Sequence, residues 1–249
     1  MHEAHIQLIL IVTLTFFLAG IVKGVTGMGL PTVAMGVLGA IMSPVAAASL
    51  LIIPSFVTNV SQLFSGQRFT ALAWRLWPMM IGIVLGTLAG SWLLTSASTR
   101  WTTAGLGIAL ALYAGFSLLA RPVSVPASME RWLSPVVGLT TGLITGGTGV
   151  FVIPAVPYLQ ALGLNKDDLI QALGLSFTIS TIALAIGLTR GGAFHLESIT
   201  ASALAMVPAL LGMWFGQAVR QRISATTFRR WFLIFLGVLG LELAIRPFF

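Results

Sequence analysis

The chain has 249 residues, of which 57% are hydrophobic and only 8% are charged. Because soluble domains carry about a quarter charged residues, this composition excludes an ordinary soluble fold. The formal net charge of +7 comes from basic residues at the ends of apolar runs, which favours a membrane and an anionic partner over nucleic acid. The absence of cysteine excludes disulfides and thiolate chemistry.

The first apolar run begins at Ile6, is interrupted at 24–29 and continues to about Met42. It lacks the basic start of a cleaved signal, so we expect it to remain in the mature protein. Lys23 is the only basic residue placed deep within an apolar run. An ionisable residue at such a depth is a functional candidate, and the alternative is a side chain that snorkels to the membrane interface.

Uninterrupted apolar segments predict six membrane-spanning helices, three in each half of the chain. They cover residues 44–65, 72–95, 100–120, 168–189, 198–219 and 229–247. Between the two sets, a second interrupted run at 132–163 is broken at Thr145-Gly146-Gly147-Thr148-Gly149. The break leaves two stretches of about 14 residues, and each would reach only about 21 Å of a bilayer core of ~30 Å.

The chain repeats itself, with a first half at 1–121, a cytoplasmic linker at 122–131 and a second half at 132–249. Pro78, Gly82 and Gly86 recur 130 residues later as Pro208, Gly212 and Gly216, and Gly27-Met28-Gly29 matches Gly147-Thr148-Gly149. Small residues four apart let membrane helices approach closely. We therefore interpret Gly82, Gly86, Gly90, Gly212 and Gly216 as packing surfaces.

Positive charge separates two topologies, because Lys and Arg near membrane ends prefer the cytoplasm. If each interrupted run crosses the membrane, the twelve basic residues outside Lys23 divide equally between the two sides. If each run turns back, nine lie on one side and three on the other. The second outcome predicts an all-α integral membrane protein of two inverted repeats, each a broken, re-entrant helical hairpin plus three transmembrane helices, with both termini outside.

The glycine breaks predict a substrate site for a small anion. Non-helical backbone at membrane depth must face protein or a watery cavity, and the helix starts that follow the breaks offer unpaired N–H groups. The alternative is that the glycines only permit a tight hairpin. The predicted substrate-binding residues are Lys23, Thr26, Gly27, Gly29, Thr145, Gly147, Thr148 and Gly149.

Polar residues within the spans extend this prediction. They are Ser55, Thr58, Asn59, Ser61 and Gln62 in the first half and Ser176, Thr178, Ser180 and Thr181 in the second. Several share one helix face, so they either bond neighbouring helices or reach the substrate. From this group we add Asn59 and Ser176 to the predicted site.

The glycine pattern resembles the TauE/SafE family of sulfite and organosulfonate exporters, also called the toluene sulfonate uptake permeases. It reads Gly20-x3-Gly24-x2-Gly27-x-Gly29 near the start and Gly138-x3-Gly142-x3-Gly146-Gly147-Thr148-Gly149-x4-Pro154 after mid-chain. The first half departs from the family's consecutive glycines and following proline. The resemblance implies multi-pass transport of small sulfur-containing anions, such as sulfite or sulfonates, across the bacterial inner membrane.

The sequence leaves two functional classes open and argues against a third. A secondary carrier, expected to export its anion, is the leading hypothesis, and an anion channel with aquaporin-like half-helices is its rival. We do not expect an enzyme, because the chain has neither Gly-x-Ser-x-Gly nor His-Glu-x-x-His and no histidine within a span. The expected partners are a small anion and the lipid bilayer, with no nucleic acid, metal or cofactor, and the sequence leaves a homodimer open.

Overall fold

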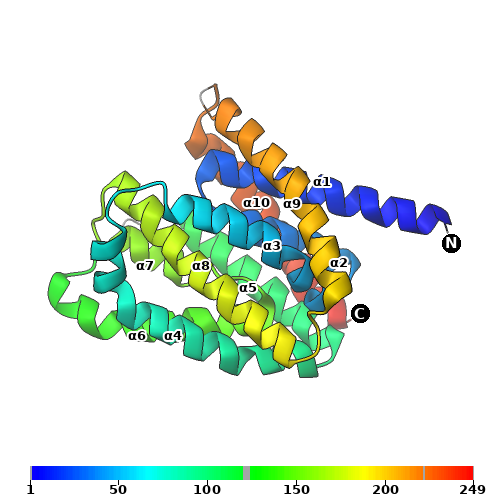
Figure 1. Ribbon diagram of the computed structural model, residues 1–249, viewed down its shortest axis with the longest axis horizontal. Coiled ribbons are helices and arrows are strands. Elements are labelled where there is room, and N and C mark those ends of the chain that lie inside the picture. Colours follow the sequence, from blue (N-terminus) through cyan, green and yellow to red (C-terminus); the bar gives the residue numbers. More distant parts are fainter. Residues whose placement is uncertain (1, 120–123, 221, 249) are drawn as a thin grey trace.

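The computed structural model describes residues 2–119, 124–220 and 222–248, and within them the chain is helical without strands. The first half contains α1 (His2–Thr26), α2 (Leu30–Ile41), α3 (Pro44–Leu63), α4 (Phe69–Ser96) and α5 (Thr99–Leu119). The second half contains α6 (Ala127–Thr148), α7 (Ala155–Ala161), α8 (Lys166–Arg190), α9 (Leu196–Val219), α10 (Ala225–Ile245) and a 3₁₀ turn, η1 (Arg246–Phe248). The long helices lie roughly side by side in one bundle (Figure 1).

All six predicted spans coincide with long helices, namely α3, α4, α5, α8, α9 and α10. In total, seven helices of the described chain are long and apolar enough to cross a membrane, and the seventh is α1, over Ile6–Thr26. The chain is therefore a multi-pass membrane protein. Helix α6 starts at Ala127, inside the segment expected to be a linker.

The predicted lengths of the interrupted stretches are wrong. Helix α6 has 22 residues, or about 33 Å at 1.5 Å per residue, whereas the helix after the break, α7, has only 7. The reason is that α6 continues through Gly146 and Gly147 and ends at Gly149, which has a φ of 74°. A glycine within a helix only weakens it by about 1 kcal/mol, and a left-handed residue is what ends it.

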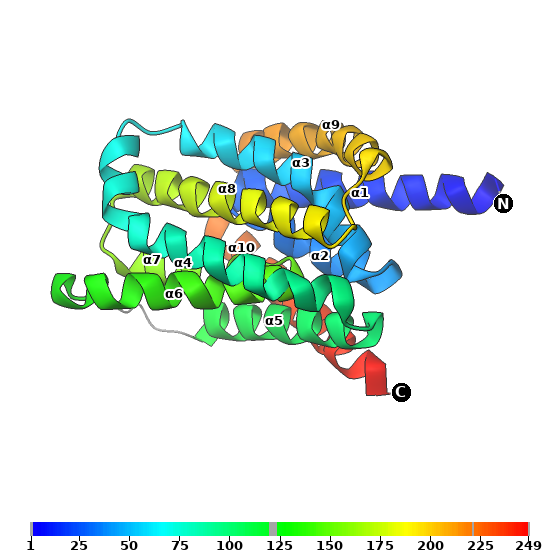
Figure 2. The same ribbon diagram turned by 60° about the horizontal axis from the view of Figure 1, so that its bottom comes forward.

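Each long arm is followed by a short helix that runs back beside it (Figure 2). Helix α2 returns along α1, joining the end of α1 to the start of α3. In the second half, the hydroxyl groups of Tyr158 on α7 and Ser134 on α6 lie 2.6 Å apart, and Tyr158 also donates to the carbonyl of Glu130. These contacts place α7 against the first turns of α6, so the chain has reversed direction after Gly149.

Glycines set two close helix crossings, as the Gly-x3-Gly spacing predicted. On α4, a Cβ added at Gly82 or Gly86 would lie 2.6 Å or 2.3 Å from a backbone oxygen of α6. On α9, a Cβ added at Gly212 or Gly216 would lie 2.0 Å or 2.4 Å from a backbone oxygen of α1. The backbones therefore touch at α4–α6 and α1–α9, and side chains larger than hydrogen do not fit there.

Proline 54 interrupts the backbone hydrogen bonds of α3, and a serine from α9 satisfies one of the groups it leaves free. Because proline has no N–H, the carbonyl of Leu50 lacks its helical donor. The hydroxyl of Ser202 donates to that carbonyl at 2.8 Å and accepts from the N–H of Ile53 at 3.0 Å. Ser202 is fully buried, so this pair of bonds fixes α9 against the middle of α3.

The outer surface suits lipid. All seven tryptophans are exposed, with fractions from 53% to 81%, beside many exposed leucines and isoleucines. Tryptophan is enriched at membrane interfaces, where its ring is apolar and its N–H stays wet. Both chain termini lie at one end of the bundle, and the helices α4, α6 and α8 begin at the other end (Figure 2).

Candidate functional site

Lys23 lies at the centre of a buried polar cluster near the end of α1. Its side chain is only 4% exposed, which rules out snorkelling. The ammonium group donates to the hydroxyl of Thr58 at 3.0 Å and to the side-chain oxygen of Asn59, both on α3. Asn59 in turn donates to the hydroxyl of Thr181 on α8 at 3.2 Å, so one chain of hydrogen bonds joins three helices. The described residues offer the ammonium no carboxylate within ion-pairing distance.

The first break lies at Gly27–Gly29, which is shorter than the predicted 24–29 because α1 continues to Thr26, and Gln62 of α3 holds it in place. Gly27 and Gly29 have φ angles of 78° and 105°, which are open to glycine and strained for other residues. The side-chain amide of Gln62 donates to the carbonyl of Gly27 at 3.0 Å. Thr26, predicted to offer its hydroxyl to a ligand, donates instead to the carbonyls of Val22 and Met28.

A cavity of about 260 Å³ leads to Lys23, and we call it the vestibule. Its walls come from α1, α3, α8 and α9, and its polar lining includes Lys23, Thr58, Ser61, Gln62, Gln217 and Arg220. Two of its lining residues lie just beyond a helix: Ser65 follows the end of α3, and Arg220 follows the end of α9. The vestibule therefore reaches the end of the bundle where α4 and α8 begin. A buried cation at its depth and a second cation near its mouth favour a small anion electrostatically.

The second break has a different environment. Gly147 lies inside α6 without a positive φ, so its predicted place in the break is wrong. Thr145 and Thr148 donate to the carbonyls of Thr141 and Ile144, so both hydroxyl donors are used within α6 and are not presented to a ligand. Gly149 packs on Met35 of α2, where an added Cβ would lie 2.9 Å from the methionine side chain.

Apolar side chains close the second break. Val150, Phe151 and Val152 are fully buried, and the rings of Phe151 and Phe177 lie 5.3 Å apart. None of the predicted residues of this break lines the vestibule. The second break packs on Met35 of α2, the helix that follows the first break, whereas Gly27 of the first break lines the vestibule.

Ser176 is buried as predicted for a site residue, yet it does not line the vestibule. Its hydroxyl has no hydrogen-bond partner among the described residues, and the same holds for Ser55, Thr87, Thr141 and Ser180. These hydroxyls lie on helices that pack around the α3–α8 pair. The structure thus brings Lys23, Asn59 and Gly27 together and leaves Ser176 apart from them.

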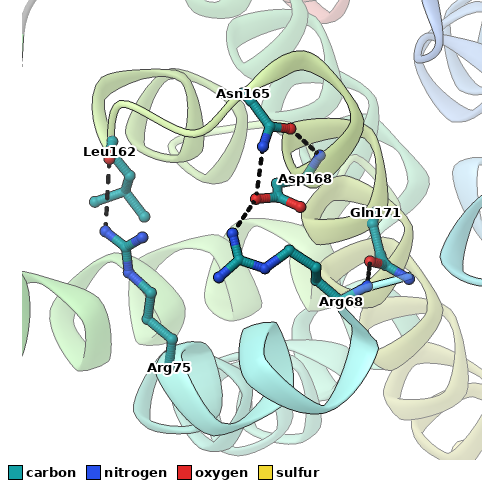
Figure 3. A network of polar contacts seen from close by, with 6 residues as sticks. All are labelled: Arg68, Arg75, Leu162, Asn165, Asp168 and Gln171. Atoms are coloured by element: carbon teal, nitrogen blue, oxygen red, sulfur yellow. Dashed lines mark hydrogen bonds and ion pairs between the residues drawn. The ribbon is translucent and has the colours of Figure 1, made fainter. Parts of the chain in front are cut away.

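A polar network fixes the end of α3 that carries the site (Figure 3). Gln171 on α8 donates to the carbonyls of Leu63 and Gly66 and accepts from the backbone N–H of Arg68. Arg68 also donates to Asp168 at 3.1 Å, and Asn165 caps α8 by accepting from the N–H of Asp168. Because the Arg68 side chain is 62% exposed, the backbone bonds of Gln171 stabilise this corner more than the ion pair does.

Comparison with known proteins decides the family. A family model described as "Sulfite exporter TauE/SafE" matches residues 12–243, nearly the whole chain. The chain belongs to the TauE/SafE family. No curated protein and no solved structure gave a match. TauE/SafE proteins form a membrane transporter family, so this chain is a multi-pass transmembrane transporter whose environment is the lipid bilayer and whose substrate is a small anion.

The sequence interpretation of this TauE/SafE chain missed two residues of the vestibule. Gln217 lies on the last turn of α9 and Arg220 directly follows that helix, and both line the cavity with Met213. Their spacing of four and three puts them on one helix face, which was the available signal. Only the packing of α9 on α1, through Gly212 and Gly216, brings that face beside Lys23.

Proposed function

We propose that this TauE/SafE chain is a secondary transporter that exports small sulfur-containing anions, such as sulfite or organosulfonates, across the bacterial inner membrane. The anion binds to Lys23 at the inner end of the vestibule. The observation that carries this proposal is a buried ammonium group without a carboxylate partner beside a cavity of about 260 Å³. An unpaired buried cation is costly, and an anionic ligand offsets that cost.

The number of hydrogen bonds at Lys23 supports a ligand. An ammonium group has three donors, and the structure gives two of them acceptors in Thr58 and Asn59. The remaining donor is available to an oxyanion in the vestibule. The charge-assisted bond formed there is the kind that anion sites use for both affinity and orientation.

The distribution of basic residues supports the direction of transport. Eight of the described basic residues belong to one end of the bundle, namely Arg68, Arg75, Arg131, Lys166, Arg220, Arg222, Arg229 and Arg230; Arg121, predicted to share that side, lies outside the described residues. Arg100, Arg190 and Arg246 belong to the other end. By the positive-inside preference the first end is cytoplasmic, so the vestibule opens to the cytoplasm and both termini face outward. An anion would therefore enter from inside the cell.

Matched contacts in the two halves support the inverted-repeat architecture that we propose for the halves 1–121 and 132–249. The crossing of α4 on α6 and the crossing of α9 on α1 use glycines at equivalent positions. Each hairpin also enters the bundle from its own end and turns back within it (Figure 2). Re-entrant hairpins that meet between oppositely oriented halves are a recurrent transporter plan.

Transport by purified protein in proteoliposomes tests the proposal. The chain has only two lysines, Lys23 and the exposed Lys166, so Lys23→Met and Lys166→Met form a matched pair. We expect Lys23→Met to lose saturable uptake of radiolabelled sulfite while Lys166→Met keeps it, with both variants eluting as folded protein. Normal uptake by Lys23→Met would refute the site. Flux that rises linearly with concentration would identify a channel instead of a carrier.

A further inference from the structure

Gln62, which lines the vestibule, carries a side-chain acceptor that no group of the described residues satisfies. Its Nε2 donates to the carbonyl of Gly27, and its Oε1 is buried without a partner among the described residues. The orientation of the amide is fixed, because turning it round would place two oxygens against each other at Gly27. Gln62 and Lys23 both line the vestibule, so the free Oε1 belongs to a side chain in the same cavity wall as the ammonium group.

An unsatisfied buried acceptor disfavours a ligand that brings only more acceptors. Oxygens of a fully deprotonated oxyanion would leave Oε1 unpaired, whereas a ligand O–H or N–H would bond to it. Leaving a buried polar group without a partner is the main reason why polar sites reject analogues that lack the matching group. Gln62 thus recognises the hydrogen-bond donor of the ligand, and Lys23 recognises its negative charge.

The charge of the vestibule points to the same class of ligand. Among the described lining residues, Lys23 is the buried charge and Arg220 lies near the mouth. One ammonium group neutralises one negative charge at this depth. A dianion would keep an uncompensated charge inside the membrane, which is costly in a medium of low dielectric constant.

Resting on the proposed function, we infer that the site selects monoanions that carry their own hydrogen-bond donor, such as hydrogensulfite or hydroxy-substituted sulfonates, over dianions and over sulfonates without a donor. Lys23 binds the sulfonate or sulfite oxygens, and Gln62 Oε1 accepts from the O–H or N–H of the ligand. Gln62 is therefore a specificity-determining residue.

Two pairs of ligands matched in size measure separately how a hydrogen-bond donor on the ligand and the charge of the ligand affect its affinity. Isethionate and propane-1-sulfonate have the same number of heavy atoms and one negative charge, but only isethionate has a hydroxyl. Methanesulfonate and sulfate are also matched in size, and only sulfate is a dianion. Calorimetric titration of the purified full-length chain in nanodiscs should show isethionate binding about tenfold tighter than propane-1-sulfonate, and methanesulfonate about tenfold tighter than sulfate.

The variant Gln62→Met should remove the preference for isethionate and keep the preference for methanesulfonate over sulfate. A wild-type protein that binds isethionate no tighter than propane-1-sulfonate, or sulfate as tightly as methanesulfonate, overturns this inference and leaves the proposed function standing. Failure of every ligand to bind overturns both. Because the comparison of ligands uses the unmodified chain, it decides the question even if Gln62→Met does not fold.

Discussion

A substitution at Gly27 tests the transport site separately from the stability of the fold. The Gly27 φ of 78° is left-handed, and a Cβ added there would meet nothing within 4 Å. Gly192, in the turn between α8 and α9, has a φ of 68° and the same open surroundings. The substitutions Gly27→Leu and Gly192→Leu should therefore cost the fold a similar amount, about 1–2 kcal/mol each for a side chain in the left-handed region.

Only Gly27 lines the vestibule, so only Gly27→Leu should impair transport. The leucine side chain would enter a cavity of about 260 Å³ and keep the anion from Lys23. Losing one charge-assisted hydrogen bond costs about 1.5–3 kcal/mol, which weakens apparent affinity by about tenfold to more than a hundredfold. Proteoliposome uptake measured over a range of sulfite concentrations gives that affinity, and thermal unfolding gives the cost to the fold.

The reasoning fails if Gly27→Leu and Gly192→Leu transport alike. Equal transport with equal stability would mean that the anion does not pass Gly27, whatever Lys23 binds. Impaired transport by both would indicate that the strain of a left-handed leucine, and not the occupation of the vestibule, is responsible.

Four other substitutions test the fold around the site. Gly86→Val should prevent folding or lower the free energy of unfolding by at least about 3 kcal/mol, because its Cβ would lie 2.3 Å from a backbone oxygen. Gly115→Ala is the control: a Cβ there would meet nothing within 4 Å, so thermal stability should be unchanged or raised. Ser202→Ala leaves two backbone groups of α3 unpaired, so thermal unfolding should show a loss of about 1–3 kcal/mol. Gly147→Ala should keep both stability and uptake, because its Cβ meets only a leucine methyl at 4.0 Å; lost uptake there would restore the prediction that Gly147 binds substrate.

The spanning helices could be predicted because their ends are marked by charge. Arg68 precedes α4, Arg100 belongs to the first turn of α5, and Arg190 ends α8, so hydropathy and charge agree on the same boundaries. The last turn of α6 carries no basic residue, and the one in the last turn of α1, Lys23, is buried and does not mark a membrane surface. Which glycine ends α6 depends on backbone conformation and on contact with Met35, and a run of glycines and threonines does not reveal either.

Part of the site could also be predicted, because a lysine within an apolar run has few purely structural explanations. Lys23 was found by that argument and Asn59 by the polar residues that share a helix face, and the two contact each other directly. Gln217 and Arg220 were missed because their place depends on how α9 crosses α1. The sequence predicted substrate-binding residues at both breaks, whereas in the structure Phe151 and its buried neighbours fill the second break.

The second half supplies an internal control for the role of Lys23. A Cβ added at Gly24 would meet the oxygen of Met213 at 2.3 Å and the Cα of Gly216 at 3.0 Å. A Cβ added at Gly142 would meet the equivalent atoms of Ile83 and Gly86 at 2.4 Å and 2.9 Å. The two crossings thus have nearly the same geometry.

The residues that precede these two glycines differ, however, since Lys23 precedes Gly24 and Thr141 precedes Gly142. Thr141 is fully buried, and the crossing of α6 on α4 forms beside it without a charge. A buried ammonium group is therefore not needed to build this kind of crossing. Since burying a charge lowers stability unless something compensates for it, the presence of Lys23 in only one half is better explained by an anion that binds there than by the fold.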